Sequence, residues 1–296
     1  MNPAAERLAW GREVLRLHCP HASGDRFADG LHGDNRLPLH RLFLVPHASP
    51  ADGGRVEDVA ARRSLPLTAG SVLWLPADRR YRFIFQPGLL LVGFHFRLEA
   101  VPGQDLLAGH LAWQAGAGRR DELAAAWRAA AGRSLADWLT LEGLLRTLLA
   151  RHVDLPWTAV EGAVRAQRRW GASLAELERL GARRAVAACA RRRGLTREGF
   201  SRAFCRELGV SPTAWLSRRL AERASEALLY SDRTCDDIAT ELGFADGFAL
   251  SRMLKRVTGR RPGELRLRGA QARNSSTASP WRSTAGREAG PDSSPQ

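Results

Sequence analysis

The fold of this 296-residue chain is decided by a segment that occurs twice in its C-terminal third. Residues 199–212 read GFSRAFCRELGVSP, and residues 249–262 read ALSRMLKRVTGRRP. The Ser-Arg pair, a second Arg, the Gly and the Pro recur in register between the two copies. A glycine that follows an amphipathic run is typical of a helix C-terminus. Each copy therefore predicts a helix, the first ending at Gly209 and the second at Gly259.

A shorter helical pattern and a turn precede each copy of the repeat. The first unit runs through residues 186–208 with a turn at Gly194, and the second through residues 234–258 with a turn at Gly243. Two helices joined by a short glycine-containing turn form a helix-turn-helix, whose second helix enters the major groove of DNA. The sequence predicts two such units, with a long helix beginning at Pro212 between them.

The charge of the chain is concentrated in the same region. The net charge is +14, and residues 180–268 hold 19 basic and 10 acidic side chains. A localised basic excess indicates a polyanionic partner, although basic side chains that only solvate helix faces remain an alternative. The composition, 44% hydrophobic and 26% charged, is that of an ordinary globular protein and excludes a collagen-like or mostly disordered chain.

The first half of the chain has a different pattern. Short apolar runs at residues 39–45, 71–75, 81–85 and 89–97 are separated by Gly, Pro and Asp. Within residues 81–85 (YRFIF) the three aromatic side chains alternate and share one face of a strand. Several short strands with regular turns predict a β-sandwich or a small barrel.

Histidines and cysteines do not form a recognisable metal site. All eight His lie in the first 152 residues, no His-x-His pattern occurs, and the nearest approach is HCPH at residues 18–21. The four Cys have no CxxC spacing, so neither a zinc finger nor a redox motif is indicated. We expect no bound metal, no cofactor and no catalytic residues. A metal-dependent enzyme built on this β-domain stays open as the less favoured alternative.

In the middle of the chain the apolar residues recur with the period of a helix. After Ser134, which can cap a helix, apolar side chains recur at spacings of three and four. The stripe contains Trp138, Leu141, Leu144, Leu145, Leu148, Leu149 and His152. This spacing suits pairing with a helix of a second copy, or packing on the β-domain of the same chain, and we slightly favour the first. A third helix is expected between Pro156 and Gly171.

Residues 186–266 resemble the DNA-binding domain of AraC/XylS-type transcription regulators. The resemblance is carried by residues 200–204 (FSRAF), 208–212 (LGVSP), 238–239 (IA), 242–244 (LGF), Asp246, 251–252 (SR), 255–256 (KR), Gly259 and Pro262. In the N-terminal half, residues 67–76 (LTAGSVLWLP) and 93–96 (GFHF) resemble the sensor cupins that accompany such domains. Two departures are Leu220, where the family usually has Arg, and the apolar start of the second recognition helix at residues 247–249.

The resemblance implies a two-domain α+β protein. We expect a cupin-like β-barrel that senses an effector over residues 1–120, and a helical linker or dimerisation segment over residues 121–172. The all-α DNA-binding domain, with two helix-turn-helix units, is expected over residues 173–268. Residues 269–296, rich in Ser, Thr, Ala, Gly and Pro, are expected to be disordered.

The resemblance also implies which side chains meet DNA. Base-edge candidates are Glu198, Ser201 and Arg202 in the first recognition helix, and Phe248, Ser251 and Arg252 in the second. Phosphate candidates are Arg197, Arg206 and Lys255. Arginine can make bidentate contacts to guanine, and glutamate can accept from cytosine N4. As an alternative, Arg202 and Arg252 can each pair with an acid inside the domain.

The implied function is a sequence-specific transcription regulator controlled by a small-molecule effector, such as a sugar or a related metabolite. Candidate pocket residues are Trp74, Tyr81, Phe83 and His95. Expected partners are promoter or operator DNA, a second copy of the chain and, if the protein is an activator, RNA polymerase. No run of about 18 uncharged apolar residues and no signal-peptide pattern occur, so we expect a cytoplasmic protein without a membrane partner. A ligand-independent regulator and an architectural DNA-binding protein are the alternatives.

Overall fold

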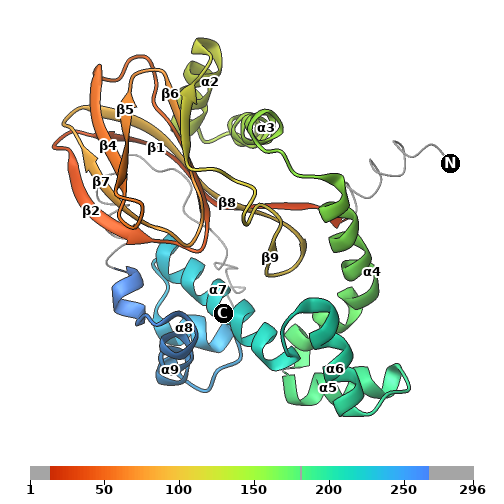
Figure 1. Ribbon diagram of the computed structural model, residues 1–296. Coiled ribbons are helices and arrows are strands. Elements are labelled where there is room, and N and C mark those ends of the chain that lie inside the picture. The colour runs from red at the N-terminus through yellow and green to blue at the C-terminus, as the bar shows by residue number, and fades with distance from the viewer. Residues whose placement is uncertain (1–13, 181, 267–296) are drawn as a thin grey trace, which may run out of the picture.

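The computed structural model describes residues 14–180 and 182–266, and Figure 1 shows a β-rich N-terminal half above a helical C-terminal half. The expected division into an α+β protein, with strands first and helices afterwards, is confirmed. No helix of the described residues is long and apolar enough to span a membrane. The disorder expected for residues 269–296 concerns a segment that lies outside the described residues.

The β-domain consists of two antiparallel sheets. The larger has the strand order β1-β8-β3-β6-β10, with β9 paired to β8, and the smaller has the order β2-β7-β4-β5. The larger sheet contains β1 (Arg16–Phe27), β3 (His40–Leu44), β6 (Ser71–Leu75), β8 (Leu89–Val101), β9 (Gln104–Asp105) and β10 (Gln114–Ala117). The smaller contains β2 (Leu31–Arg36), β4 (Asp52–Asp58), β5 (Arg63–Thr68) and β7 (Arg80–Phe85). Over the residues that the structure describes, the sheets share no ladder, so the expected barrel is not closed.

The four apolar runs of the sequence are β3, β6, β7 and β8. The strands that periodicity did not single out, β1, β2, β4 and β5, carry polar or partly exposed residues along much of their length. Two of them also contain proline. β1 accommodates Pro20 within a register shift between His18 and His21, and Pro66 lies in β5 at the edge of the smaller sheet. Proline lacks a ladder donor, so bulges and edges are where strands tolerate it.

Each face of the larger sheet has its own core. The layer between the two sheets contains Phe43, Leu73, Tyr81, Phe83 and Phe85, among others. The opposite face packs against α2 (Arg120–Ala131) and α3 (Leu135–His152), and its cluster includes Trp74, Phe94 and Phe96. The alternation along β6 and β8 therefore divides their apolar side chains between two clusters.

The apolar stripe of α3 packs on the β-domain of its own chain. Leu141, Leu145 and Leu148 are buried in the cluster beneath α2 and α3. This packing corrects the slight preference for a helix of a second copy, because most of the stripe is already covered. The first turns of α3 leave large apolar side chains exposed, with Leu135 at 70%, Trp138 at 43% and Leu139 at 52%.

The C-terminal half is helical, and residues 262–266 are helical in addition to the six helices that carry labels. They are α4 (Trp157–Leu180), α5 (Ala182–Arg192), α6 (Arg197–Leu208), α7 (Pro212–Tyr230), α8 (Cys235–Glu241) and α9 (Gly247–Thr258). The expected end of a helix at Gly171 was wrong, since α4 continues to Leu180. A glycine within a helix costs only about 1 kcal/mol relative to alanine. Burial of Trp170, Leu174 and Leu177 around it outweighs that cost.

The two predicted helix-turn-helix units are the pairs α5–α6 and α8–α9, joined by α7 (Figure 1). The first half of α7 contributes Trp215 and Leu216 to a cluster with α4, α5 and α6. Its second half contributes Ala224 and Leu228 to a cluster with α8 and α9. One helix thus belongs to the cores of both units.

A glycine in the bulge of β4 generates a stability prediction. Gly54 has φ +100°, and a Cβ there would lie 2.0 Å from the carbonyl oxygen of Ile84. Gly109 has φ +80°, but a Cβ there meets nothing within 4 Å. We expect Gly54→Ala to lower the free energy of unfolding by about 3 kcal/mol, and Gly109→Ala by about 1 kcal/mol. Chemical denaturation of both variants measures the difference, and equal losses would contradict the predicted steric conflict.

Candidate nucleic-acid interface

The two recognition helices are capped at both ends, and their C-terminal ends lie at the glycines that the sequence indicated. Thr196 Oγ1 accepts a hydrogen bond from the Gly199 amide at 3.0 Å, and Asp246 Oδ1 accepts one from the Ala249 amide at 2.7 Å. These side chains satisfy amides that a helix start leaves unpaired. At the C-terminal ends Gly209 adopts φ 72° and Gly259 φ 75°. Both helices are therefore fixed by local chemistry at each end.

Burial of one face of each helix decides which side chains point outward. On α6 the buried positions are Phe200, Phe204 and Leu208, and on α9 they are Leu250, Met253 and Leu254. All nine candidate DNA-contact residues lie outside these buried sets. Ser201 and Ser251 are half-buried, whereas Glu198, Arg202, Phe248, Arg252, Arg197, Arg206 and Lys255 are exposed.

The arginines on these outer faces are not engaged by the protein. Arg197, Arg202, Arg206 and Arg252 have no ion pair or hydrogen bond to any residue within 14–180 and 182–266. Elsewhere in the same domain Arg223 and Arg233 both pair with Glu241. The alternative in which Arg202 and Arg252 pair with an internal acid is therefore not the arrangement of this structure. Lys255 differs, because its Nζ donates to the Gly259 carbonyl at 3.0 Å.

Phe248 is the most unusual side chain of this surface. It lies in the first turn of α9 and is 78% exposed, although it is a large apolar group. An apolar side chain at this place can contact a thymine methyl group but cannot read a hydrogen-bond pattern. The second helix therefore presents Ser251 and Arg252 as its polar candidates.

The length of α7 sets the spacing between the two units. α7 has 19 residues, which corresponds to about 28 Å of helix. One turn of B-DNA spans about 34 Å, the separation at which consecutive major-groove segments face the same side. The helix-turn-helix units lie toward opposite ends of α7 (Figure 1). Their separation is thus of the order that two consecutive groove contacts require.

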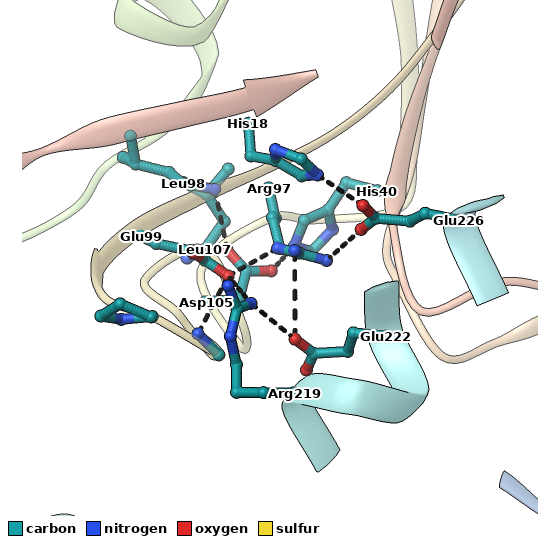
Figure 2. A network of polar contacts seen from close by, with 12 residues as sticks. His18, His40, Arg97, Leu98, Glu99, Asp105, Leu107, Arg219, Glu222 and Glu226 are labelled. Carbon is teal, nitrogen blue, oxygen red and sulfur yellow. Dashed lines mark hydrogen bonds and ion pairs between the residues drawn. The ribbon is translucent and has the colours of Figure 1, made fainter. Parts of the chain in front are cut away.

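A buried cluster of charges connects α7 to the β-domain (Figure 2). Arg97 of β8 lies 2.5 Å from Glu99 of the same strand and donates from Nη1 to Glu226 of α7 at 2.7 Å. Glu222, one turn earlier on α7, is 3.9 Å from Arg97. The Arg97 side chain is only 6% exposed, so these acids replace water as its partners.

Two further side chains complete this cluster. His18 Nε2 lies 2.9 Å from Glu226 Oε2, and Arg219 of α7 pairs with Glu222 at 2.8 Å and with Glu99 at 3.6 Å. Leu220 occupies the position at which the family usually has an arginine, and Arg219 is the residue before it. The interdomain charge cluster, defined as His18, Arg97, Glu99, Arg219, Glu222 and Glu226, therefore balances acids against bases across the contact.

The cluster shifts the acidity of its two acids on α7 in opposite directions. Burial raises the pKa of Glu222, and the guanidinium groups of Arg97 and Arg219 offset this only in part. Burial also acts to raise the pKa of Glu226, but hydrogen bonding from His18 and the charge of Arg97 outweigh it and lower that pKa. Glu226 is therefore the acid that the β-domain holds most firmly in its charged form.

Neutral contacts extend the same interface along α7. His95 Nδ1 lies 2.6 Å from the hydroxyl of Tyr230, the last residue of α7. At the other end of the helix, Trp215 Nε1 donates to the Pro102 carbonyl at 3.0 Å. The β-domain therefore contacts α7 near its start, in its middle and at its end.

The structure places three of the four candidate pocket residues on one face of the larger sheet and the fourth on the opposite face. Trp74 belongs to the cluster under α2 and α3, whereas Tyr81 and Phe83 lie in the layer between the sheets. His95 faces Tyr230. Sequence reasoning did not single out Arg97, Glu222 or Glu226. Their pattern, charged residues alternating on a strand or four apart on a helix, is the same as that of a solvated surface.

Two hollows accompany these features. An apolar cavity of about 200 Å³ lies between β1, β8 and α3, lined by Cys19, Phe94 and Leu141 among others. A groove of about 480 Å³ runs between the domains, from Arg36 and Asp78 to α7 and the end of α9. Within the described ranges no group of three or more His, Cys, Asp or Glu side chains is placed to hold a metal ion.

Comparisons with known proteins place the C-terminal half. A family model described as a helix-turn-helix domain (HTH_18), of the AraC type, matches residues 189–268. No curated protein matches the chain.

Among solved structures, ToxT from Vibrio cholerae is 10% identical, covers 86% of this chain and 99% of its own, and has a TM-score of 0.43. ToxT from strain SCE256 with a bound unsaturated fatty acid is 12% identical, with coverages of 85% and 94% and a TM-score of 0.42. The C-terminal domain of AraT, a response regulator from Geobacillus stearothermophilus, is 26% identical over 28% of this chain and 68% of its own, with a TM-score of 0.26.

The assignment of the C-terminal half rests on the family match and on the geometry of α5 to α9. The matched residues contain both recognition helices, their caps and the connecting helix. Residues 189–268 therefore match the model of a helix-turn-helix domain family, and α5 to α9 have the geometry of two such units.

Proposed function

We propose that this protein is a sequence-specific DNA-binding transcription regulator whose β-domain holds a small-molecule effector. The observation that carries the proposal is the pair of capped recognition helices on one connecting helix, with arginines on their outer faces that no described residue engages. A basic surface of this kind matches the phosphate backbone, and side chains on the helices reach base edges. We propose no enzymatic activity for the chain.

The roles of the candidate residues follow from their positions on the helices. Glu198, Ser201 and Arg202 of α6, and Phe248, Ser251 and Arg252 of α9, are proposed to meet base edges. Arg197, Arg206 and Lys255 are proposed to meet phosphates. Because Lys255 also caps its own helix, its phosphate contact competes with the hydrogen bond to Gly259. Because Phe248 cannot read a hydrogen-bond pattern, the first unit is proposed to supply most of the sequence discrimination.

Effector control is proposed to act through α7. The interdomain charge cluster and the contact between His95 and Tyr230 join strands β1 and β8 to the helix that holds both units. An effector that binds the β-domain changes DNA affinity only if it favours one arrangement of these contacts over another. Dimer formation, and contact with RNA polymerase in the case of an activator, belong to the same proposal.

The base-contact roles can be tested against a phosphate role. We expect Arg202→Ala to lower discrimination at one base-pair position by about 1–3 kcal/mol. Arg206→Ala should weaken all sites alike and reduce the salt dependence of binding by about one charge. Full-length protein is used to select sites from a genomic fragment library, and the affinities of the variants for the selected site and for single-base changes are then measured.

The matched control is Arg146→Ala, which removes an arginine that is also exposed but lies on α3 and pairs with Glu142. It should change neither affinity nor discrimination. A selection that enriches no sequence would contradict the proposed regulator and favour an architectural DNA-binding protein. Equal losses for Arg202→Ala at every base change would move that arginine to the phosphate contacts.

The interdomain charge cluster predicts strong coupling between Arg97 and Glu226. In a double-mutant cycle with Arg97→Met and Glu226→Gln, we expect a coupling energy of about 2 kcal/mol, because both partners are largely buried. The exposed pair Arg82–Glu57 is the control and should show about 0.5 kcal/mol or less. Denaturant unfolding of the four variants in each cycle gives both values. A coupling energy for Arg97–Glu226 no larger than that of the control pair would show that this ion pair does not stabilise the contact between the domains.

A further inference from the structure

The two recognition helices are built alike and differ in chemistry at their second position. Each has 12 residues and ends at a glycine with a left-handed backbone. In each, the capping side chain accepts a hydrogen bond from the amide of the third helical residue. When the caps are aligned, residues 201–202 (SR) of α6 fall on residues 251–252 (SR) of α9. The same alignment places Glu198 on Phe248.

Glu198 and Phe248 offer different chemistry to equivalent places in a groove. Both side chains are exposed. Within residues 14–180 and 182–266, no hydrogen bond or ion pair engages the Glu198 carboxylate, so it is available to accept from cytosine N4. The Phe248 side chain has no polar atom. Its counterpart in the major groove is the C5-methyl group of thymine, the apolar group among the base edges there.

The backbone beneath Phe248 is held against the preceding helix. The Gly247 amide donates to Asp236 Oδ1 of α8 at 2.9 Å, and a Cβ on Gly247 would lie 2.8 Å from the same oxygen. Asp246 accepts from the Ala249 amide at 2.7 Å. Both acids at the start of α9 are therefore turned to backbone amides. No carboxylate in this first turn does for the second unit what Glu198 can do for the first.

Phe248 stands beside the polar readers of its own helix. Ser251 and Arg252 follow it by three and four positions, which places all three side chains on one face of α9. In the described part of the chain the Phe248 ring joins no apolar cluster and contacts no other ring. A single exposed apolar side chain is common on protein surfaces. Here its place among the proposed base contacts gives the ring a specific counterpart.

We propose that Phe248 makes the second helix-turn-helix unit a reader of the C5-methyl group of a pyrimidine. The two half-sites share the bases met by the Ser-Arg pairs and differ at one position, with cytosine at Glu198 and thymine at Phe248. The inference deepens the proposed function, on which it rests, by naming the DNA chemistry that the second unit recognises.

Recognition of a methyl group makes binding sensitive to DNA modification. 5-Methylcytosine carries its methyl group on the same ring atom as thymine, and a phenyl ring does not distinguish the hydrogen-bonding groups of the two bases. Where the second half-site holds cytosine, methylation of its C5 therefore creates the group that Phe248 contacts. The affinity for such a site rises on methylation.

The test uses full-length protein and duplexes of the site selected from the genomic library. Each thymine is replaced in turn by deoxyuridine, which lacks only the C5-methyl group, and Arg252→Ala identifies the half-site bound by α9. We expect one replacement in that half-site to weaken binding about fourfold, the effect of one methyl group leaving an apolar contact. Phe248→Ser should bind both duplexes equally, and it should remain folded because the ring is 78% exposed.

Cytosine at the same position extends the test. We expect the cytosine duplex to bind about as weakly as the deoxyuridine duplex, and 5-methylcytosine to restore most of the affinity. Phe248→Glu should instead prefer cytosine over thymine about fivefold, through a hydrogen bond from N4. The reciprocal variant Glu198→Phe should make the first half-site sensitive to the methyl group.

The matched control is Leu139→Ser, which removes an exposed leucine from α3 and should leave the response to deoxyuridine unchanged. A response that Phe248→Ser retains would overturn the proposal, and altered self-association of that variant would then assign the ring to a contact between copies. Wild-type protein that responds at no thymine, or that binds cytosine and 5-methylcytosine equally, would overturn it as well.

A pair of random-sequence duplex pools, one with thymine and one with deoxyuridine throughout, separates this inference from the proposed function. If the genomic selection enriches no site, the regulator is contradicted. Weaker binding of the deoxyuridine pool by wild type, but not by Phe248→Ser, would still support methyl recognition, and equal binding of both pools would overturn it. An enriched site without any response to deoxyuridine supports the regulator and overturns methyl recognition.

Discussion

Helix α7 has to satisfy three surroundings at once, and the arrangement of the molecule depends on this constraint. Its first half is part of the core of α4, α5 and α6, and its second half is part of the core of α8 and α9. The remaining side presents Glu222, Glu226 and Tyr230 to the β-domain. Rotation of the helix would expose apolar side chains on two sides and bury unpaired acids on the third. The position of each unit relative to the β-domain follows from that single helix.

The nature of the interdomain contact suits a protein whose parts change their relation. Its centre consists of ion pairs and hydrogen bonds rather than of packed apolar side chains. When charged groups separate, water hydrates them again and offsets part of the lost attraction. When apolar surfaces separate, their exposure to water costs free energy in proportion to their area. Interfaces of this polar kind resemble transient protein–protein contacts more than domain cores. The interdomain charge cluster therefore fixes how the β-domain meets α7, and the two can still separate at a moderate cost in free energy.

Features that depend on neighbouring residues could be predicted from the sequence, whereas contacts between distant segments could not. The terminal glycines Gly209 and Gly259 act within one turn, so the repeated pattern that they end predicted the recognition helices. The strands found were those with short, mainly apolar runs. The end of a helix predicted at Gly171 was wrong because burial of apolar side chains in α4 outweighs the low helix propensity of glycine. The apolar stripe of α3 has the same spacing whether it packs on its own β-domain or on a helix of a second copy.

The residues that were missed depend on contacts between distant segments. Arg97 and Glu226 are 129 positions apart, and each alone looks like a surface charge. Arg41 stands in the stretch HRLFL of β3, whose five residues are all buried, and no periodicity reveals which face of the sheet its side chain occupies. Trp74 was grouped with the other pocket candidates for the same reason. Trp74 and Phe83 are both strand aromatics, but they lie on opposite sides of the larger sheet.

The far end of β8 has a consequence for how this protein can be divided. Val101, the last residue of that strand, is fully buried in the cluster that contains Trp170, Phe200 and Trp215. The helical half therefore completes its own core with a side chain from the β-domain, and the Pro102 carbonyl satisfies the indole of Trp215. A fragment cut before α4 would leave an apolar notch open to water. Exchange of sensor domains between proteins of this architecture thus has to preserve the shape of a strand end as well as the linker.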